Sequence, residues 1–148
     1  MNALPVKVKT LRPEARPPFY ASAGAAGADL YACLPEPLVL APGQRGLAPT
    51  GVALEMTESG HAALIFARSG LAARGLALAN GVGVVDEDYR GEICVPLVNL
   101  GRETITLRSG ERVAQMVFVP SRRALFLPEE NLTATERGSG GFGSTGKS

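Results

Sequence analysis

Short runs of apolar residues, separated every several positions by glycine or proline, set the pattern of the chain. Leu4, Val6 and Val8 alternate with polar neighbours and predict a first strand. Further strand-like runs lie at 38–40, 47–56, 61–67, 93–99, 104–107 and 113–119. No stretch keeps apolar residues at helical spacing over about three turns. The pattern therefore predicts an all-β domain, built as a sandwich or a barrel.

The segment Gly81–Glu92, GVGVVDEDYRGE, is the stretch around which we expect the chain to be organised. Its valines favour a strand, and the turn-forming residues on both sides predict a hairpin that ends in an acidic corner. Its first two glycines leave backbone donors and acceptors bare for a flat ligand, and Tyr89 can set an aromatic ring beside it. Asp86, at the corner, can act on water. A surface hairpin with a polar turn is the alternative.

Three other places carry groups suited to binding phosphate. Asp29 lies among residues too small to screen its charge, although a turn cap is the alternative. The segment 67–72, ARSGLA, places a cation, a hydroxyl and a glycine where a strand gives way to a turn or a helical start. Gln115 is a polar residue in an apolar strand, where it either faces solvent or turns its amide toward a ligand.

The last stretch, residues 137–148, reads RGSGGFGSTGKS and is expected to be disordered when nothing is bound. We therefore predict one domain over 1–136 and a flexible tail over 137–148. Residues 141–148 match the nucleotide-binding pattern G-x-x-x-x-G-K-[ST], but no strand precedes them and no helix follows, so we do not expect a Walker loop. Glycine amides and hydroxyls can still wrap a polyphosphate, and Phe142 can stack on a base. A terminal linker is the alternative.

Length and charge exclude several classes of protein. At 148 residues the chain suits one domain with a core of its own. Its 15 basic and 14 acidic residues give a net charge of +1, which provides no bulk field for nucleic acid or an anionic membrane. No run approaches the ~20 apolar residues of a membrane span, and no apolar leader stands at the N-terminus. We expect a soluble, cytoplasmic protein.

The cysteines and the histidine carry little signal. Cys33 and Cys94 lack metal-ligand spacing and are expected to be small buried hydrophobic residues in a reducing compartment. His61 stands at a strand start without a neighbouring acid, cysteine or second histidine in a recognisable spacing. We expect it to be structural or exposed.

Five segments in one order resemble the trimeric dUTPase family. They are AGADL at 26–30, ARSGLA at 67–72, GVGVVDEDYRGE at 81–92, GERVAQM at 110–116 and RGSGGFGSTG at 137–146. The resemblance spans nearly the whole chain, with Ala67 where many relatives have proline and Glu111 where many have aspartate. It implies a jelly-roll-like β-barrel or sandwich subunit, a homotrimer with shared active sites, and Mg²⁺-dependent cleavage of dUTP to dUMP and pyrophosphate. Such an enzyme limits uracil in DNA and supplies dUMP for dTMP synthesis, with no nucleic-acid or membrane partner.

The resemblance also implies roles for individual residues. Asp86 matches the base that orients and deprotonates the water attacking the α-phosphorus, Asp29 matches the acid that holds Mg²⁺ through water, and Arg137 looks like the γ-phosphate clamp. The phosphate contacts are Arg68, Ser69, Gly70 and Gln115. The remaining substrate contacts are Asn80, Gly83, Val85, Tyr89, Phe142, Gly143 and Ser144.

Among these contacts, Asn80 and the backbone around Gly83 would read the uracil edge, and close packing would exclude the methyl group of thymine. Tyr89 would lie under the sugar and leave no space for a ribose hydroxyl. Phe142 would stack on uracil when the tail closes. Whether the tail closes over its own site or a neighbour's stays open, as does the role of residues 147–148.

Two alternatives remain. A dCTP deaminase shares the fold, but its pattern has Asp-Pro-Gly-Phe where this chain has residues 86–89, DEDY, and a catalytic glutamate where this chain has Pro96. A binding protein of this fold could instead present a nucleotide-closed tail to a protein partner. No sequence feature specifies such a surface, and the intact Asp86 argues for turnover.

Overall fold

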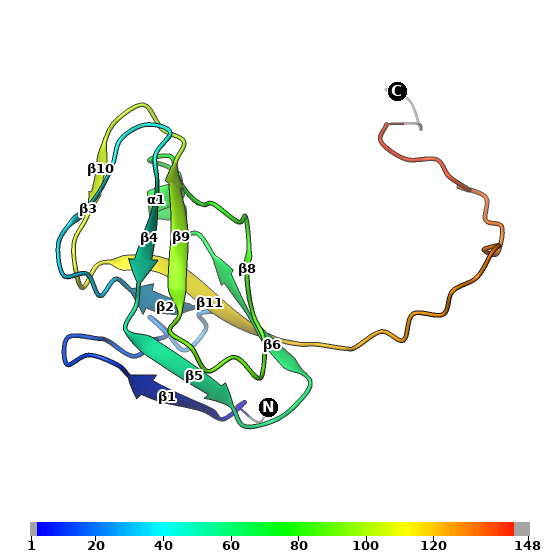
Figure 1. Ribbon diagram of the computed structural model, residues 1–148, viewed down its shortest axis with the longest axis horizontal. Coiled ribbons are helices and arrows are strands. Elements are labelled where there is room, and N and C mark those ends of the chain that lie inside the picture. Colours follow the sequence, from blue (N-terminus) through cyan, green and yellow to red (C-terminus); the bar gives the residue numbers. More distant parts are fainter. Residues whose placement is uncertain (1–2, 144–148) are drawn as a thin grey trace.

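The computed structural model describes residues 3–143, whose regular secondary structure consists almost entirely of short β-strands (Figure 1). The strands are β1 (Val6–Thr10), β2 (Ala28–Tyr31), β3 (Leu38–Leu40), β4 (Arg45–Pro49), β5 (Val52–Met56), β6 (His61–Phe66), β7 (Leu76–Leu78), β8 (Gly83–Val85), β9 (Cys94–Asn99), β10 (Ile105–Leu107) and β11 (Arg112–Pro120). The one helix in this part of the chain, α1 (Ser69–Ala72), is too short to cross a membrane. The prediction of an all-β domain is confirmed.

The strands form small antiparallel sheets that stack into one body. A four-stranded sheet has the order β2-β11-β6-β8, and a three-stranded sheet has the order β4-β9-β7. Two further pairs, β1-β5 and β3-β10, lie at opposite ends of the body (Figure 1). Because neighbours in a sheet are rarely neighbours in sequence, the chain crosses repeatedly between sheets, and residues far apart in sequence meet in the core.

One apolar core joins all of these sheets. Along β9 the burial alternates, with Val95 and Leu97 buried and Pro96 and Val98 partly exposed, as the two-residue period of a strand requires. The largest fully buried apolar side chains are Leu30, Leu40, Val52, Leu76, Val95, Leu97, Ile105, Leu107, Val113 and Met116. These side chains come from seven different strands, so burial of their apolar surface holds the sheets together.

The prediction of a single strand over 47–56 is wrong. The chain ends β4 at Pro49 and begins β5 at Val52, and these strands belong to different sheets. Gly51 lies between them with a φ of 71°, a conformation that favours glycine. A Cβ atom there would lie 2.6 Å from the Cβ of Ala15. The apolar run therefore continues through a bend, which hydrophobicity alone does not reveal.

The prediction of a hairpin over 81–92 is also wrong, although its strand exists as β8. β8 pairs with β6, whereas β9, the next strand along the chain, pairs with β4 and β7. Residues 86–93 are thus a connection between two sheets. Two strands, β2 and β7, were not predicted at all, because their three or four residues carry no clear alternation.

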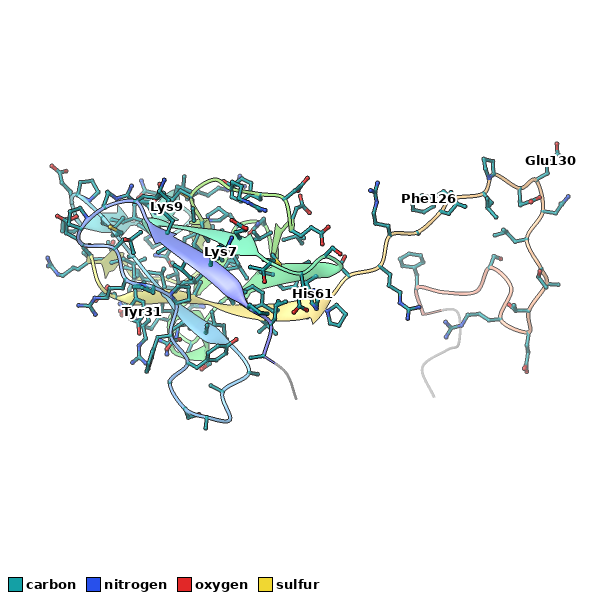
Figure 2. All side chains as sticks on the ribbon, turned by 90° about the horizontal axis from the view of Figure 1, so that it is seen from below. Lys7, Lys9, Tyr31, His61, Phe126 and Glu130 are labelled. Carbon is teal, nitrogen blue, oxygen red and sulfur yellow. The ribbon has the colours of Figure 1, made fainter. Side chains whose placement is uncertain are left out.

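Beyond β11 the chain leaves the body as a long arm. Residues 121–143 contain no strand or helix and extend away from the sheets (Figure 1). Figure 2 shows Phe126 and Glu130 far from the body, which the arm leaves on the side of His61. Several large apolar side chains on the arm are exposed: Leu125, Phe126, Leu127, Leu132 and Phe142. The domain boundary at residue 136 stays a prediction.

A buried asparagine closes the end of the three-stranded sheet. The Asn99 side chain is fully buried, and its amide nitrogen donates to the carbonyl oxygens of Leu40 and Glu103 at 2.8 Å each. Its amide oxygen accepts from the backbone N–H of Gly101 at 2.9 Å. The Asn99 side chain thus satisfies three backbone groups, one at the end of β3 and two in the connection between β9 and β10.

We expect Asn99→Ala to lower the free energy of unfolding by about 2–4 kcal/mol, because three backbone groups lose their partner in a buried place. Urea denaturation followed by circular dichroism, at matched protein concentration, measures this change. Asn131→Ala, on the exposed arm, is the control and should shift stability by less than ~0.5 kcal/mol. Equal unfolding midpoints for the two variants would contradict the role of Asn99.

Candidate active site

An open pocket lies where β8 and the connection 86–93 meet β9. It has a volume of about 280 Å³, just below the range of about 300–1,000 Å³ that is usual for ligand sites, which suits a nucleoside better than a whole nucleoside triphosphate. Its lining is Ile65, Leu78, Asn80, Gly83, Val84, Val85, Asp86, Tyr89, Glu92, Ile93, Cys94 and Pro96. The structure therefore brings together five of the predicted site residues, namely Asn80, Gly83, Val85, Asp86 and Tyr89.

Glycine allows the strand that forms one wall of this pocket to approach its neighbour. In the β8–β6 pairing, Gly83 lies opposite Ile65 and Val85 lies opposite Ala63. A Cβ atom on Gly83 would lie 3.0 Å from the Cβ of Ile65, so a larger residue would push the strands apart. Asn80 precedes the strand in a turn, in which its carbonyl accepts from the N–H of Val82 at 2.9 Å.

Backbone and tyrosine contacts hold the connection that carries Asp86. The Tyr89 N–H donates to the Asp86 carbonyl at 3.1 Å, and the Tyr89 hydroxyl donates to the Glu92 carbonyl at 3.0 Å. Glu87 accepts from the N–H of Gly60 at 2.6 Å, which ties the connection to the turn before β6. Among residues 3–143, no hydrogen bond or ion pair engages the Asp86 carboxylate, which is exposed. It is available to accept a proton.

A second cluster of predicted residues gathers where β2, β6 and β11 meet. The Arg68 Nε lies 2.8 Å from the Asp29 Oδ1, and the Asp29 side chain is only 9% exposed. Gln115 lies opposite both Asp29 and Phe66 in the sheet, and its amide donates to the Ala67 carbonyl at 3.0 Å. The sequence left two orientations open for Gln115, and the structure turns its amide toward Ala67, next to Arg68. Ser69 and Gly70 follow as the exposed start of α1.

Sequence reasoning missed Arg112 in this cluster. Its guanidinium lies 3.3 Å from the Asp29 Oδ2, so each oxygen of this carboxylate faces an arginine. Arg112 belongs to the segment GERVAQM, but only the pairing of β11 with β2 brings it to Asp29. The motif could have indicated Arg112 as a candidate, but the sequence does not show that Asp29 is its partner.

Asp86 and the second cluster lie at opposite ends of β6. Asp86 follows Val85, which pairs with Ala63, and the antiparallel register therefore places Asp86 beside Ala62 at the start of β6. Arg68 lies two positions after Phe66, the last residue of the same strand. The six residue steps from Ala62 to Arg68, at about 3.3 Å each, separate Asp86 from Arg68 by about 20 Å.

Arg12 and Glu92, on the far side of the pocket, also escaped the sequence analysis. Hydrogen bonding to the Arg12 guanidinium holds the pKa of Glu92 below its usual value, and the same contact raises the pKa of Arg12. Cys33 is buried, as expected, and its Sγ lies 3.5 Å from the Arg12 Nε. Cys94 is only half buried in the pocket wall, where burial raises the pKa of its thiol.

The predicted tail residues lie apart from both clusters. Arg137, Phe142 and Gly143 are exposed on the arm, and its final described stretch lies well away from the sheets (Figure 1). The Phe142 side chain contacts no wall of either cluster. Ser144 lies outside the described residues.

Metal-binding groups are sparse in the described part of the chain. Between residues 3 and 143, no three histidine, cysteine, aspartate or glutamate side chains are arranged to hold an ion together. His61 is half buried, with an Nδ1 that has no hydrogen-bond partner among these residues.

Comparisons with known proteins agree on one family. The dUTPase family model matches residues 14–146. A deoxyuridine 5'-triphosphate nucleotidohydrolase of Desulfitobacterium hafniense (strain DSM 10664 / DCB-2) is 51% identical, with all of both chains covered. One of Azoarcus sp. (strain BH72) is 46% identical over 99% of each chain. The solved Staphylococcus bacteriophage 80alpha dUTPase with dUPNHPP is 26% identical, with a TM-score of 0.87 over 97% of this chain and 99% of that one.

These matches extend over nearly the whole chain, including both clusters and most of the arm. They also match the fold, since the phage enzyme superposes on the same arrangement of strands. The chain belongs to the dUTPase family.

Proposed function

We propose that the chain hydrolyses dUTP to dUMP and pyrophosphate, in active sites that are shared between the jelly-roll subunits of a homotrimer. Membership of the family makes it a dUTP diphosphatase. The observation that carries the finer proposal is that Asp86, at the rim of a nucleoside-sized pocket, and the arginine-lined cluster lie at opposite ends of β6. The reaction limits uracil in DNA and supplies dUMP for dTMP synthesis.

The pocket supplies the recognition of base and sugar. Asn80 and the backbone of Gly83 present donors and acceptors at its wall, where the uracil edge can pair. Tyr89 places its ring at the same pocket, and a sugar packed against that ring leaves no room for a 2′-hydroxyl. Val85, which is 8% exposed, completes the close packing around the ligand.

Asp86 is the proposed general base. Its carboxylate lies at the rim of the pocket and has no partner among the described residues, so it can orient a water and take its proton. The water oxygen attacks the α-phosphorus, and the bond from that phosphorus to the bridging oxygen of the pyrophosphate breaks. A positioned base of this kind is typically worth about 10² to 10⁴ in rate.

The second cluster is proposed to bind the phosphates. Arg68 and the exposed amides and hydroxyl of Ser69 and Gly70 suit an anionic chain, and Gln115 adds an amide donor. Asp29 fits a role in holding Mg²⁺ through water. The arginines use one lone pair on each of its oxygens, which leaves further lone pairs for the hydrogens of metal-bound water. When bound, Mg²⁺ neutralises charge on the departing pyrophosphate.

The direction of the substrate supports sites shared between chains. A nucleotide with its base at Gly83 and its α-phosphate at Asp86 runs along β8 and therefore points its phosphates away from Arg68 of the same chain. About 20 Å separates Asp86 from Arg68. The phosphates must then meet the Arg68 cluster of another subunit. Arg137, Phe142, Gly143 and Ser144 of an arm would close over the assembled site.

A specific feature of the pocket disfavours deamination. Pro96 lies in the pocket wall at the place where the deaminase pattern has its glutamate, and a proline side chain cannot donate or accept a proton. Ammonia release from dCTP would be required to revive this alternative.

Pyrophosphate release from dUTP, dCTP, dTTP and UTP, measured side by side with Mg²⁺ and with chelator, tests which nucleotide is the substrate. We expect Mg²⁺-dependent release from dUTP alone.

We expect Asp86→Asn to lower the rate of dUTP hydrolysis about 10²- to 10⁴-fold while dUTP still binds, because the amide keeps the shape but cannot take a proton. Single-turnover pyrophosphate release and calorimetric binding separate the two effects. Glu87→Gln is the matched control, since its amide oxygen can still accept from Gly60. Near-normal turnover in Asp86→Asn would contradict the proposed base.

Mixed subunits test whether sites are shared. Asp86→Asn and Arg68→Ala proteins should each be nearly inactive alone, yet regain activity when they are unfolded together and refolded. A mixed assembly contains sites with Asp86 from one chain and Arg68 from another, and both groups are intact there. The control is each variant refolded alone. Absence of any gain in the mixture would place both groups of one site in the same chain.

Removal of residues 137–148 should leave the circular dichroism spectrum and the assembly unchanged, because residues 137–143 lie away from the sheets. We expect hydrolysis of dUTP to fall by at least roughly 10²-fold, since an open site admits water and loses the Arg137 contact. Removal of residues 147–148 alone is the control and should change nothing. Full activity of the longer deletion would make the tail a linker.

A further inference from the structure

A partly buried link connects the start of the chain to the connection that carries Tyr89. The Arg12 guanidinium bonds both oxygens of Glu92, through one short contact and a second at 3.4 Å from its Nη1. The same carboxylate accepts from the N–H of Gly51 at 2.7 Å. Next to Arg12, the Leu11 N–H donates to the Gly51 carbonyl at 2.7 Å. These contacts fix the Glu92 side chain in the bend between β4 and β5.

The backbone of Glu92 in turn fixes the tyrosine ring. The Tyr89 hydroxyl donates to the Glu92 carbonyl at 3.0 Å, and the ring folds back over Gly91, where a Cβ atom would lie 2.4 Å from the hydroxyl oxygen. Tyr89 itself is 46% exposed, so core packing alone does not hold its ring. The position of the ring therefore depends on where Glu92 is held.

Resting on the proposed function, we propose that Arg12 is a positioning residue that acts through Glu92 to hold Tyr89 against the sugar. Arg12 contacts neither the pocket nor any predicted substrate contact, so it acts only by way of Glu92. Because rejection of a ribose hydroxyl relies on a closely packed wall, the link sets how strongly dUTP is preferred over UTP.

The Arg12–Glu92 ion pair differs from an exposed ion pair elsewhere in the protein. The exposed pair Lys7–Glu55 joins β1 to β5 at 2.8 Å, with side chains that are 69% and 40% exposed. The Arg12 and Glu92 side chains are 39% and 23% exposed, and a guanidinium can hold both carboxylate oxygens at once. Only the second pair leads on to a residue of the pocket. Lys7→Gln is thus a matched control for Arg12→Gln.

The experiment compares dUTP with UTP for the full-length protein. We expect Arg12→Gln to reduce the ratio of kcat/KM for dUTP over UTP by roughly tenfold, mainly because UTP improves. Lys7→Gln should keep the wild-type ratio. Arg12→Lys retains one charged donor and should fall between Arg12→Gln and wild type. A purely structural role would lower the unfolding midpoint of Arg12→Gln and leave the ratio unchanged, which would overturn the proposal.

Two further measurements test whether Arg12 acts through Glu92 and whether the sugar preference is present in binding alone. The double variant Arg12→Gln with Glu92→Gln should show the same ratio as the more affected single variant, whereas two independent effects would multiply and contradict action through Glu92. Dissociation constants of dUDP and UDP give the sugar preference without turnover. Failure of the wild-type protein to cleave dUTP would overturn the proposed function, and the dUDP and UDP constants would still decide the role of Arg12.

Discussion

The antiparallel register between β6 and β8 is the constraint on which the site depends. It places Gly83 opposite Ile65 in the pocket wall, and so fixes the position of Asp86 at the end of β8. The same strand, β6, then carries the chain to Arg68 and its contact with Asp29. The start of β6 lies beside Asp86 and its end leads to Arg68. The length of this strand therefore sets the distance between the two parts of the site. In the proposed assembly, each subunit would contribute these two halves to different sites.

Small residues and hydrogen bonds from carboxylates keep this part of the fold in place. Gly83 lets β8 approach β6, and Gly51 allows the bend that separates β4 from β5. Carboxylates then tie the long connection between β8 and β9 at both ends, with Glu87 bonded to Gly60 and Glu92 bonded to Gly51. Since this connection has no ladder of its own, its shape depends on these side chains rather than on strand pairing. Residues remote from the ligand therefore shape the pocket.

The sequence predicts most strands and five residues of the pocket, and it fails where the outcome depends on pairing. Asn80, Gly83, Asp86 and Tyr89 lie within ten positions of one another, so a local motif is enough to group them. The hairpin prediction failed because valines specify a strand but not its partner, and β8 turned to β6 instead of β9. The contacts of Arg12 and Arg112 join segments about 80 residues apart, which no local pattern encodes.

The division of the site along β6 also affects how the enzyme behaves when it is scarce. A newly made chain, alone, carries a pocket without phosphate contacts and an arm whose leucines and phenylalanines face water. If each site is shared between chains, as proposed, activity would appear only on assembly and would rise more steeply than in proportion to the amount of protein. Dilution would then silence the enzyme reversibly. Each defective chain would also impair the sites that it shares with its neighbours, so damage to one copy would spread through the assembly.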